Sequence, residues 1–436
     1  MLLNKLAKSI CMICSICLLQ SQVTIAQEAG RLPAADTLRL ELTAAEKMFL
    51  DNNLQLLAEH YNIQSAQALA EQARKWENPI LNTDQNVYSG NRFFQHGRDA
   101  NGNPTGQAYV QVQQLIKTAG KRGRQMDLSR TNVSQAEWQF KGVLRNLRAT
   151  LIKDYYTVDQ LTGKAQLYAD NMQRLNKLLL AREAELKAGN IAQKEYLRVQ
   201  ALIISLQHDM TENAKELSDA ESELKTLLQV TGNKFVLPVL PLQETAIAPD
   251  AGIMQLVDSA RQNNTDYRQE LYQLQYNRQN LRLQRALAAP DVTVGPEFDQ
   301  NSNYTPNYFG LALSLPLPVW DRNKGNIKSA RYQVKQEEAM LTMADDKLQN
   351  DVLNAYQKLL YTIRLASGSN TQFYLEYNKL QRNIVESYNN RQIGLIEFLE
   401  YFKDYQEVRE QQLDQLLSLR LAKLELNDVV GVDIAR

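Results

Sequence analysis

The stretch from Leu311 to Ile327, LALSLPLPVWDRNKGNI, decides the fold because its hydrophobic period changes inside it. Apolar residues occupy every second position from Leu311 to Val319, which places one apolar row on one face of a β-strand. From Gly325 onward the apolar residues recur every three or four positions, which is the period of a helix. The sequence therefore predicts a strand that leads directly into a very long helix.

Two prolines and a tryptophan close this predicted strand. Pro316 and Pro318 have no N–H to donate, so they mark an edge, a bend or the exit of the strand. Trp320 follows beside charged residues, a combination that suits both a membrane–water boundary and a capped soluble hairpin. On this stretch alone both interpretations stay open.

The N-terminus has the pattern of a secretory signal peptide at 1–26. Lys5 and Lys8 precede an apolar run and a polar stretch that ends in the small residue Ala26. The three cysteines also lie in this leader, and we interpret their CxxC-like spacing as apolar filler rather than as a metal or redox motif. We therefore expect an exported protein whose mature chain has no thiol.

Charge and hydropathy exclude two further classes of protein. Without Lys5 and Lys8 the chain keeps 47 basic residues against 49 acidic ones, which is not the basic excess of a nucleic-acid-binding protein. Beyond the leader no run of 18 uninterrupted apolar residues occurs, so a spanning helix is not expected. If the chain enters a membrane, it does so with strands.

The mature chain is a duplication. Residues of the first half recur in the second half at a slowly drifting displacement of 211, 202, 205 and 199 positions, as loop insertions would produce. The recurring sets are Asn52, Asn53, Tyr61 and Pro79 with Asn263, Asn264, Tyr272 and Pro290; Lys121–Gly123 with Asn323–Gly325; Gly189, Ile191, Glu195 and Tyr196 with Gly394, Ile396, Glu400 and Tyr401; and Val230 and Gly232 with Val429 and Gly431.

The duplication sets the predicted domains: a first repeat at 27–232, a proline-containing connector at 233–252, a second repeat at 253–431 and a tail at 432–436. Each repeat contains an opening helix, two strands, a long helix and a returning helix. In the first repeat these parts are 42–77, 80–88, 108–116, 120–188 and 191–230. In the second they are 253–288, 292–298, 308–319, 325–392 and 396–429.

The predicted strands cannot serve a membrane alone. Val110 and Val112 alternate with Gln111 and Gln113, as expected for lipid on one face and water on the other. Four strands are too few for a closed barrel, and an open sheet edge is not tolerated in lipid. Several chains would have to share their strands.

Three features carry a family resemblance: the duplication, the prolines where helix becomes strand (Pro79 and Pro290) and the strand exit LPLPVWDRNKG. In these the chain resembles the TolC family of outer-membrane efflux proteins, most of all its CzcC/CusC heavy-metal efflux branch. The resemblance implies a mainly α fold with a small membrane β part: long coiled-coil helical hairpins and four strands per chain in a shared 12-stranded trimeric β-barrel. It also implies a bacterial outer-membrane location with a long periplasmic extension.

The same resemblance implies the function and the partners. The chain would be the outer-membrane channel of a tripartite efflux system, working as a homotrimer with a periplasmic membrane-fusion adaptor, an inner-membrane pump of the RND type and outer-membrane lipid. It would conduct substrates passively, metal cations among them, with no cofactor. The rival interpretation is a non-membrane periplasmic coiled-coil adaptor or structural protein.

Three groups of residues are the candidate sites. The resemblance assigns adaptor contact to the hairpin tips, Gly189, Asn190, Ile191, Gly394, Leu395 and Ile396. It assigns the periplasmic mouth to Glu195 and Glu400, where an acidic ring would attract cations, although Arg391 and Lys403 near the second tip depart from an acidic constriction. Trp320 is the candidate membrane-interface aromatic.

Motifs of catalysis are absent from the sequence. The mature chain has no nucleophile elbow, P-loop, HExxH or paired-cysteine site, and His60, His96 and His208 share no ligand spacing. We therefore expect neither an enzyme nor a resident metal.

Overall fold

The computed structural model describes residues 36–435 except positions 90, 95–96, 99, 103, 241–248 and 368–369. The predicted signal peptide and parts of the predicted connector and tail lie outside the described residues. The chain forms two compact units, each built from both repeats. The sheet unit comprises Leu54–Ala149, Ile247–Tyr361 and Ala422–Arg436, and the tip unit comprises Met1–Asn53, Thr150–Ala246 and Thr362–Leu421.

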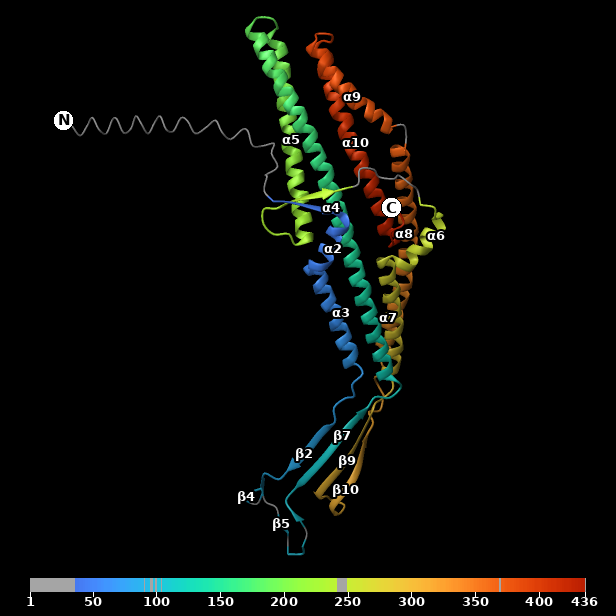
Figure 1. Ribbon diagram of the computed structural model, residues 1–436. Coiled ribbons are helices and arrows are strands. Elements are labelled where there is room, and N and C mark those ends of the chain that lie inside the picture. The colour runs from blue at the N-terminus through green and yellow to red at the C-terminus, as the bar shows by residue number, and fades with distance from the viewer. Residues whose placement is uncertain are drawn as a thin grey trace, which may run out of the picture. The chain divides into compact units, whose positions relative to one another are not determined.

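The sheet unit contains one antiparallel four-stranded sheet in the order β2-β7-β9-β10 (Figure 1). The strands are β2 (Ile80–Gln85), β7 (Ala108–Ile116), β9 (Val292–Asn301) and β10 (Pro306–Ser314). The central pair, β7 with β9, joins the two repeats. β2 and β10 form the two edges of this sheet, and each has a strand on one side only.

The two faces of the sheet differ in polarity. On the polar face, the Tyr109 hydroxyl and the Gln111 amide both donate to Glu297 Oε2, at 3.0 and 3.1 Å. Val110 pairs with Phe298 on the opposite face. The structure thus confirms the predicted alternation of glutamines and valines. The exposed apolar face consists of Leu81, Val110, Val112, Phe298, Phe309, Leu311 and Leu313.

Two predicted strands are shorter in the structure. β10 ends at Ser314, so the expected strand 308–319 does not continue through the alternating residues that follow it. Pro316 and Pro318 lack the N–H that a ladder needs, which explains the early end. The expected strand 80–88 ends at Gln85, and the β3–β4 hairpin of Tyr88–Ser89 and Arg92–Phe93 follows. A second small hairpin pairs β5 (Gly97–Arg98) with β6 (Pro104–Thr105).

Helices of the sheet unit follow the same lateral order as the strands. Those that follow this order are α3 (Leu54–Gln72), the first part of α4 (Lys121–Lys187), α7 (Thr265–Leu287) and most of α8 (Lys324–Ser367), while α6 (Ile253–Asn263) and the end of α10 (Leu395–Val430) also belong to this unit. Side chains link each neighbouring pair: Gln139 with Glu59 for α3–α4, Gln135 with Gln273 for α4–α7, and Asn277 with Glu337 for α7–α8.

Each predicted opening helix is divided by an asparagine. The expected helix 42–77 consists of α2 (Leu42–Asn52) and α3, and the expected helix 253–288 consists of α6 (Ile253–Asn263) and α7. Asn264 has extended backbone, and its Oδ1 accepts the N–H groups of Asp266 and Tyr267, both at 3.0 Å. This capping ends one helix and starts the next. Asn264 Nδ2 also donates to Val429 O at 2.9 Å.

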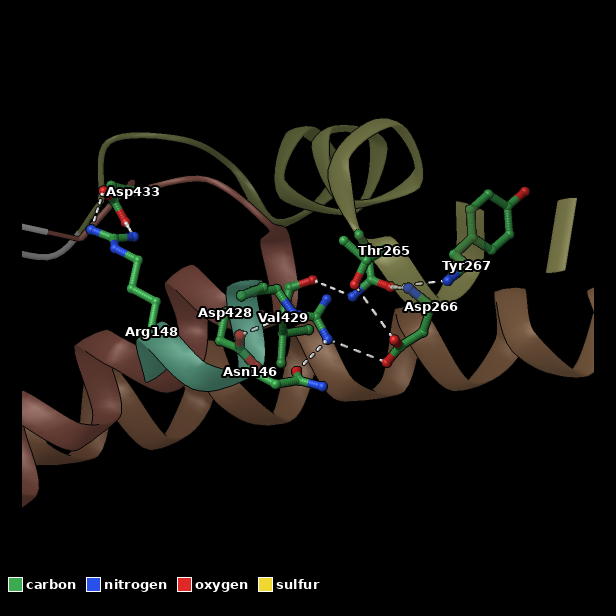
Figure 2. Close-up of polar contacts among 10 residues, drawn as sticks. Asn146, Arg148, Thr265, Asp266, Tyr267, Asp428, Val429 and Asp433 are labelled. Carbon is green, nitrogen blue, oxygen red and sulfur yellow. Dashed lines mark hydrogen bonds and ion pairs between the residues drawn. The ribbon is translucent and has the colours of Figure 1, made fainter. Parts of the chain in front are cut away.

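Two arginines of α4 bind carboxylates at the end of α10 and in the segment that follows it, within the sheet unit; Figure 2 shows Arg148 with Asp433. Arg145 lies 3.3 Å from Asp266 and 3.1 Å from Asp428. Arg148 binds both carboxylate oxygens of Asp433, each at 3.1 Å. A bidentate pair of this kind fixes geometry as well as charge. The C-terminal segment is therefore held against α4.

The tip unit contains a strand pair that the sequence did not predict. β1 (Thr37–Glu41) runs parallel to β8 (Phe235–Val239), inside the expected connector. The buried Tyr155 hydroxyl joins them, because it lies 2.8 Å from Leu40 O and accepts the Val239 N–H at 3.0 Å. Pro238 is tolerated in β8 because this sheet has only two strands, so each is an edge.

The hairpins of the tip unit consist of the second part of α4, α5 (Gln193–Leu228), α9 (Asn370–Asn389) and most of α10, and α2 belongs to the same unit. α4 is continuous through Thr162 and Gly163. The expected helix 325–392 is instead two helices, α8 and α9. The fold is mainly helical with few strands, as predicted.

Candidate functional site

The hairpin tips of the tip unit are the candidate site, and their backbones are alike. At the first tip Gly189 has φ +76°, and the Asn190 N–H donates to Glu185 O at 2.9 Å. At the second tip Arg391 has φ +57°, and the Gln392 N–H donates to Ser387 O at 2.8 Å. Both patterns end a helix with one left-handed residue.

This geometry changes which residues correspond. At the second tip Arg391, and not Gly394, takes the left-handed conformation that Gly189 has at the first tip. Gly394 instead precedes α10, and its carbonyl accepts the Phe398 N–H at 3.0 Å. Glu195 lies in the first turn of α5, where the N-terminal dipole favours a carboxylate, and Glu397 holds that place in α10. Glu400 lies on α10 beyond that first turn and is exposed.

The predicted tip residues differ in exposure. Gly189, Asn190, Gly394 and Ile396 are exposed, Ile191 is half-buried and Leu395 is buried. Gly189 and Asn190 at the first tip, and Gly394 and Ile396 at the second, therefore form small exposed surfaces. Leu395 instead packs in the core beneath the second tip.

A charged network joins the two hairpins just below the tips. Arg182 and Glu185 of α4 form an ion pair at 2.5 Å, and Arg391 reaches the other carboxylate oxygen of Glu185 at 3.3 Å. The Arg182 guanidinium also lies 4.6 Å from the ring centroid of Tyr388 on α9. Charge pairing and cation–π contact thus link the long helix of the first repeat to that of the second.

Tyr388 connects this network to the predicted mouth. Burial raises the pKa of its hydroxyl, Arg182 opposes that shift, and Glu195 and Glu185 add to it. Glu195 is therefore within electrostatic range of the network that holds the hairpins. Sequence reasoning missed Glu185 and Tyr388, because nothing in the sequence signals a pairing between residues about 200 positions apart.

An apolar core lies under the network and is shared by α4, α5, α9 and α10. Tyr388 stacks on Phe398 with ring centroids 4.6 Å apart. The buried members of this core are Leu167, Tyr168, Leu175, Leu178, Val199, Ile203, Leu206, Tyr388, Leu395, Phe398 and Phe402. Side chains of both repeats interlock here, so the two hairpins pack as one bundle.

Lys403 lies away from the tips, in a groove of about 240 Å³ between α5 and α10. Asp209, Glu407 and Glu410 line the same groove, so this lysine shares it with three acidic side chains. Arg391 is paired with Glu185. The two basic residues that depart from an acidic mouth therefore both have acidic neighbours.

Other candidate features lie in the sheet unit or concern metals and membranes. Trp320 follows β10 and is 95% exposed. Among the residues that the structure describes, no helix is long and apolar enough to cross a membrane. Within the same residues, no group of three or more His, Cys, Asp or Glu side chains is arranged to hold a metal ion.

Comparison with known sequences identifies the family. A model of the family described as outer membrane efflux protein matches residues 47–229 and 256–389. The cobalt-zinc-cadmium resistance protein CzcC of Cupriavidus metallidurans is 23% identical over 337 residues, which are 76% of this chain and 72% of CzcC. The nickel-cobalt-cadmium resistance protein NccC of Alcaligenes xylosoxydans is 24% identical over 291 residues, 66% of this chain and 62% of NccC.

Solved structures share the fold. Crystal structures of CusC superpose with a TM-score of 0.71 at 15% identity, over 90% of this chain and 92% of CusC. A membrane protein from Pseudomonas aeruginosa superposes with a TM-score of 0.73 at 16% identity, over 92% of this chain and 93% of that protein. The CmeC outer-membrane channel of Campylobacter jejuni superposes with a TM-score of 0.72 at 13% identity, over 90% of this chain and 86% of CmeC.

These matches exclude the rival interpretation of a non-membrane adaptor or rod. Family members are channels and not enzymes, and they work as homotrimers with periplasmic adaptors and inner-membrane pumps. Because the family model covers most of its length, this chain belongs to the outer membrane efflux protein family and is an outer-membrane channel of a tripartite efflux system.

Proposed function

We propose that this channel conducts divalent metal cations passively and catalyses no reaction. CzcC and NccC, the curated relatives named above, are both metal-resistance proteins, of cobalt, zinc and cadmium and of nickel, cobalt and cadmium. The candidate mouth carries carboxylates at Glu195, Glu397 and Glu400, which would attract cations if they line an opening. The energy for export would come from the pump.

The observation that carries the channel architecture is the open lateral order of the sheet unit. The strands lie side by side in the order β2-β7-β9-β10, and the helices lie in the matching order α3-α4-α7-α8. Both series begin in the first repeat and end in the second. The inner junction, α4 with α7 and β7 with β9, joins repeat one to repeat two. The same junction between chains would join α8 and β10 to α3 and β2 of the next chain.

The inner junction predicts what the outer one contains. Trp138 of α4 contacts Tyr272 of α7, with ring centroids 6.4 Å apart. Their counterparts in the other repeat, displaced by 202 and 211 positions, are Met340 of α8 and Tyr61 of α3, and both are exposed. We therefore infer that Tyr61 of one subunit packs near Met340 of its neighbour. The shared twelve-stranded barrel that would accompany this packing stays a prediction.

The tips are the proposed docking and gating elements. Gly189, Asn190, Ile191, Gly394, Leu395 and Ile396 would meet the adaptor, and Glu195 with Glu400 would narrow the mouth. The ion pair between Glu185 and Arg391 supports this role, because it holds the hairpins together directly below the tips. Trp320 is proposed to lie at the membrane interface next to the helices.

Gene deletion tests the substrate. Loss of the gene should sensitise the host to cobalt, zinc, nickel or cadmium salts and leave tolerance of dyes and antibiotics unchanged. Complementation with the parent gene is the control. Unchanged metal tolerance together with sensitivity to dyes would contradict the metal assignment and leave the channel assignment intact.

Single-channel recording of the reconstituted protein tests the mouth. Glu195→Gln combined with Glu400→Gln should raise conductance or lower cation selectivity. Glu216→Gln, an exposed position farther along α5, serves as the matched control. Identical behaviour of the double variant and the control would remove both glutamates from the gate.

A further inference from the structure

The β3–β4 hairpin presents an aromatic surface at the end of the sheet that is remote from the helices (Figure 1). Phe93 is 73% exposed and Phe94 is 64% exposed, and Val87 and Tyr88 beside them are also exposed. Burying a phenylalanine side chain removes a large apolar area from water and is therefore favourable. Two adjacent phenylalanines in water are therefore a feature that needs a partner.

The backbone of this turn is strained. Asn91 has φ +62° and Phe94 has φ +48°. Asparagine enters the left-handed region readily, but a bulky residue such as Phe94 does so only at an energetic cost. The outlier lies at the residue that carries one of the two exposed rings. Strain of this kind is found where the surrounding structure enforces a functional geometry.

Local contacts hold the strained turn in place. The Phe94 N–H donates to Val87 O at 2.8 Å, and the Tyr88 hydroxyl donates to Asn91 Oδ1 at 3.0 Å. The Tyr88 and Phe93 rings lie 4.9 Å apart. Phe93 is thus supported from one side by Tyr88 and still presents most of its surface outward.

Basic side chains accompany the rings. Arg92 precedes Phe93, and Arg98 lies in the next hairpin, where its guanidinium donates to Gly102 O at 2.8 Å and leaves other N–H groups available. Both arginines are exposed. An aromatic ring with a neighbouring guanidinium matches a lipid surface, because the ring enters the acyl boundary and the guanidinium binds headgroup phosphates.

The length of the sheet places a membrane boundary near this hairpin. β7 has nine residues and so spans about 30 Å along the strand. At the tilt of about 40° that is common in outer-membrane sheets, this gives a height of about 23 Å, close to the roughly 25 Å apolar band of such proteins. Trp320 lies at the helical end of the apolar face, so the second boundary falls at the opposite end, where the hairpin is.

We propose that the β3–β4 hairpin is a lipid anchor, in which Phe93 and Phe94 insert into the outer leaflet and Arg92 and Arg98 bind its phosphate-bearing headgroups. Exposure, backbone strain, charge and position on the sheet all support this role. The anchor requires the outer-membrane location but not metal transport. A failure of the metal assignment therefore leaves it untouched.

Spin labels test the insertion. Single cysteines at Phe93→Cys or Phe94→Cys are labelled in the full trimer, reconstituted in vesicles of phosphatidylethanolamine and phosphatidylglycerol; the native cysteines are confined to positions 11, 14 and 17. Collisions with oxygen, which concentrates in lipid, are compared with collisions with a polar nickel complex. Asn303→Cys, in the exposed β9–β10 connection at the same end of the sheet, is the matched control.

We expect labels at 93 and 94 to favour oxygen and the label at 303 to favour nickel. Labels at 93 and 94 that favour nickel would place the hairpin in water and overturn the proposal. Labels shielded from both reagents would overturn it too, because a neighbouring subunit would then be the occupant.

The headgroup contact has its own test. Arg92→Gln with Arg98→Gln should reduce the preference of the label at position 93 for oxygen over nickel in vesicles that contain phosphatidylglycerol. High salt should reduce this preference by a similar amount in the labelled protein that keeps both arginines. An unchanged preference in both experiments would overturn the phosphate contact.

Discussion

Asp154 is a carboxyl group that should destabilise the protein at neutral pH. It lies on α4 in the tip unit, is only 4% exposed, and its Oδ2 has no hydrogen-bond partner. Burial raises the pKa of Asp154 from 3.8 to about 6, Glu223 adds to the shift, and Lys153 opposes it. A carboxyl whose pKa is raised in the folded state holds its proton more tightly in the folded protein than in the unfolded chain. The free energy of unfolding is therefore highest below pH 3.8 and falls as the pH rises through 6.

The shift sets the size of the effect. A pKa of about 6 in place of 3.8 corresponds to a loss of about 3 kcal/mol in the free energy of unfolding of each chain above pH 7. This is an upper value, because water that enters the site lowers the desolvation penalty. Asp154→Asn keeps the shape of the protonated acid and removes the charge. The variant should therefore be more stable than the parent at pH 8 and equally stable near pH 4.

Thermal unfolding of the detergent-solubilised trimer between pH 4 and pH 8 measures this difference. Asp219→Asn, an exposed position on α5, is the control and should match the parent at every pH. The reasoning fails if Asp154→Asn is less stable than the parent at pH 8. It also fails if the difference between them does not change with pH.

Three further predictions concern contacts of the two units. Tyr155→Phe removes the hydroxyl that joins β1 and β8 and leaves the buried Leu40 carbonyl and the partly buried Val239 N–H without this partner. Thermal unfolding should therefore show a loss of about 1–3 kcal/mol, and parent-like stability would contradict this. Glu185→Gln weakens the ion pair with Arg391, so single-channel recordings should show more frequent opening. An unchanged open probability would argue that this ion pair does not keep the channel closed. Arg148→Gln breaks the bidentate pair with Asp433, so limited proteolysis should remove the C-terminal residues faster than in the parent, and equal rates would show that this pair does not hold the tail.

Periodicity and duplication predicted most of the helical architecture and the pairing faces of the sheet. Val110 and Gln111 lie on opposite faces because alternation in a strand follows from local geometry alone. The helix breaks at Asn53 and Asn264 were not predicted. The asparagine pairs recur in the sequence, but a capping asparagine and an asparagine inside a helix look the same there.

The rest depended on contacts between distant segments. β1 with β8 is a parallel pair between residues almost 200 positions apart, and such pairing leaves no local signal. At the tips, matching identical residues placed Gly394 opposite Gly189, whereas the backbone places Arg391 there and makes Glu397 the counterpart of Glu195. Arginine in a left-handed turn is uncommon, so glycine was the better guess from sequence and the wrong one.

The central claim is that neighbouring subunits close the open sheet unit by repeating its inner junction. Disulfide trapping tests it with Tyr61→Cys and Met340→Cys in one chain, and Met343→Cys, also exposed on α8, as the alternative to Met340. Val110→Cys with Phe298→Cys, which are direct partners across β7 and β9, is the control that should close within one chain, because paired strand residues lie within disulfide range. Covalent dimers and trimers from the Tyr61 pairs are expected on a non-reducing gel. The claim is contradicted if the control closes and neither Tyr61 pair yields a species larger than the monomer.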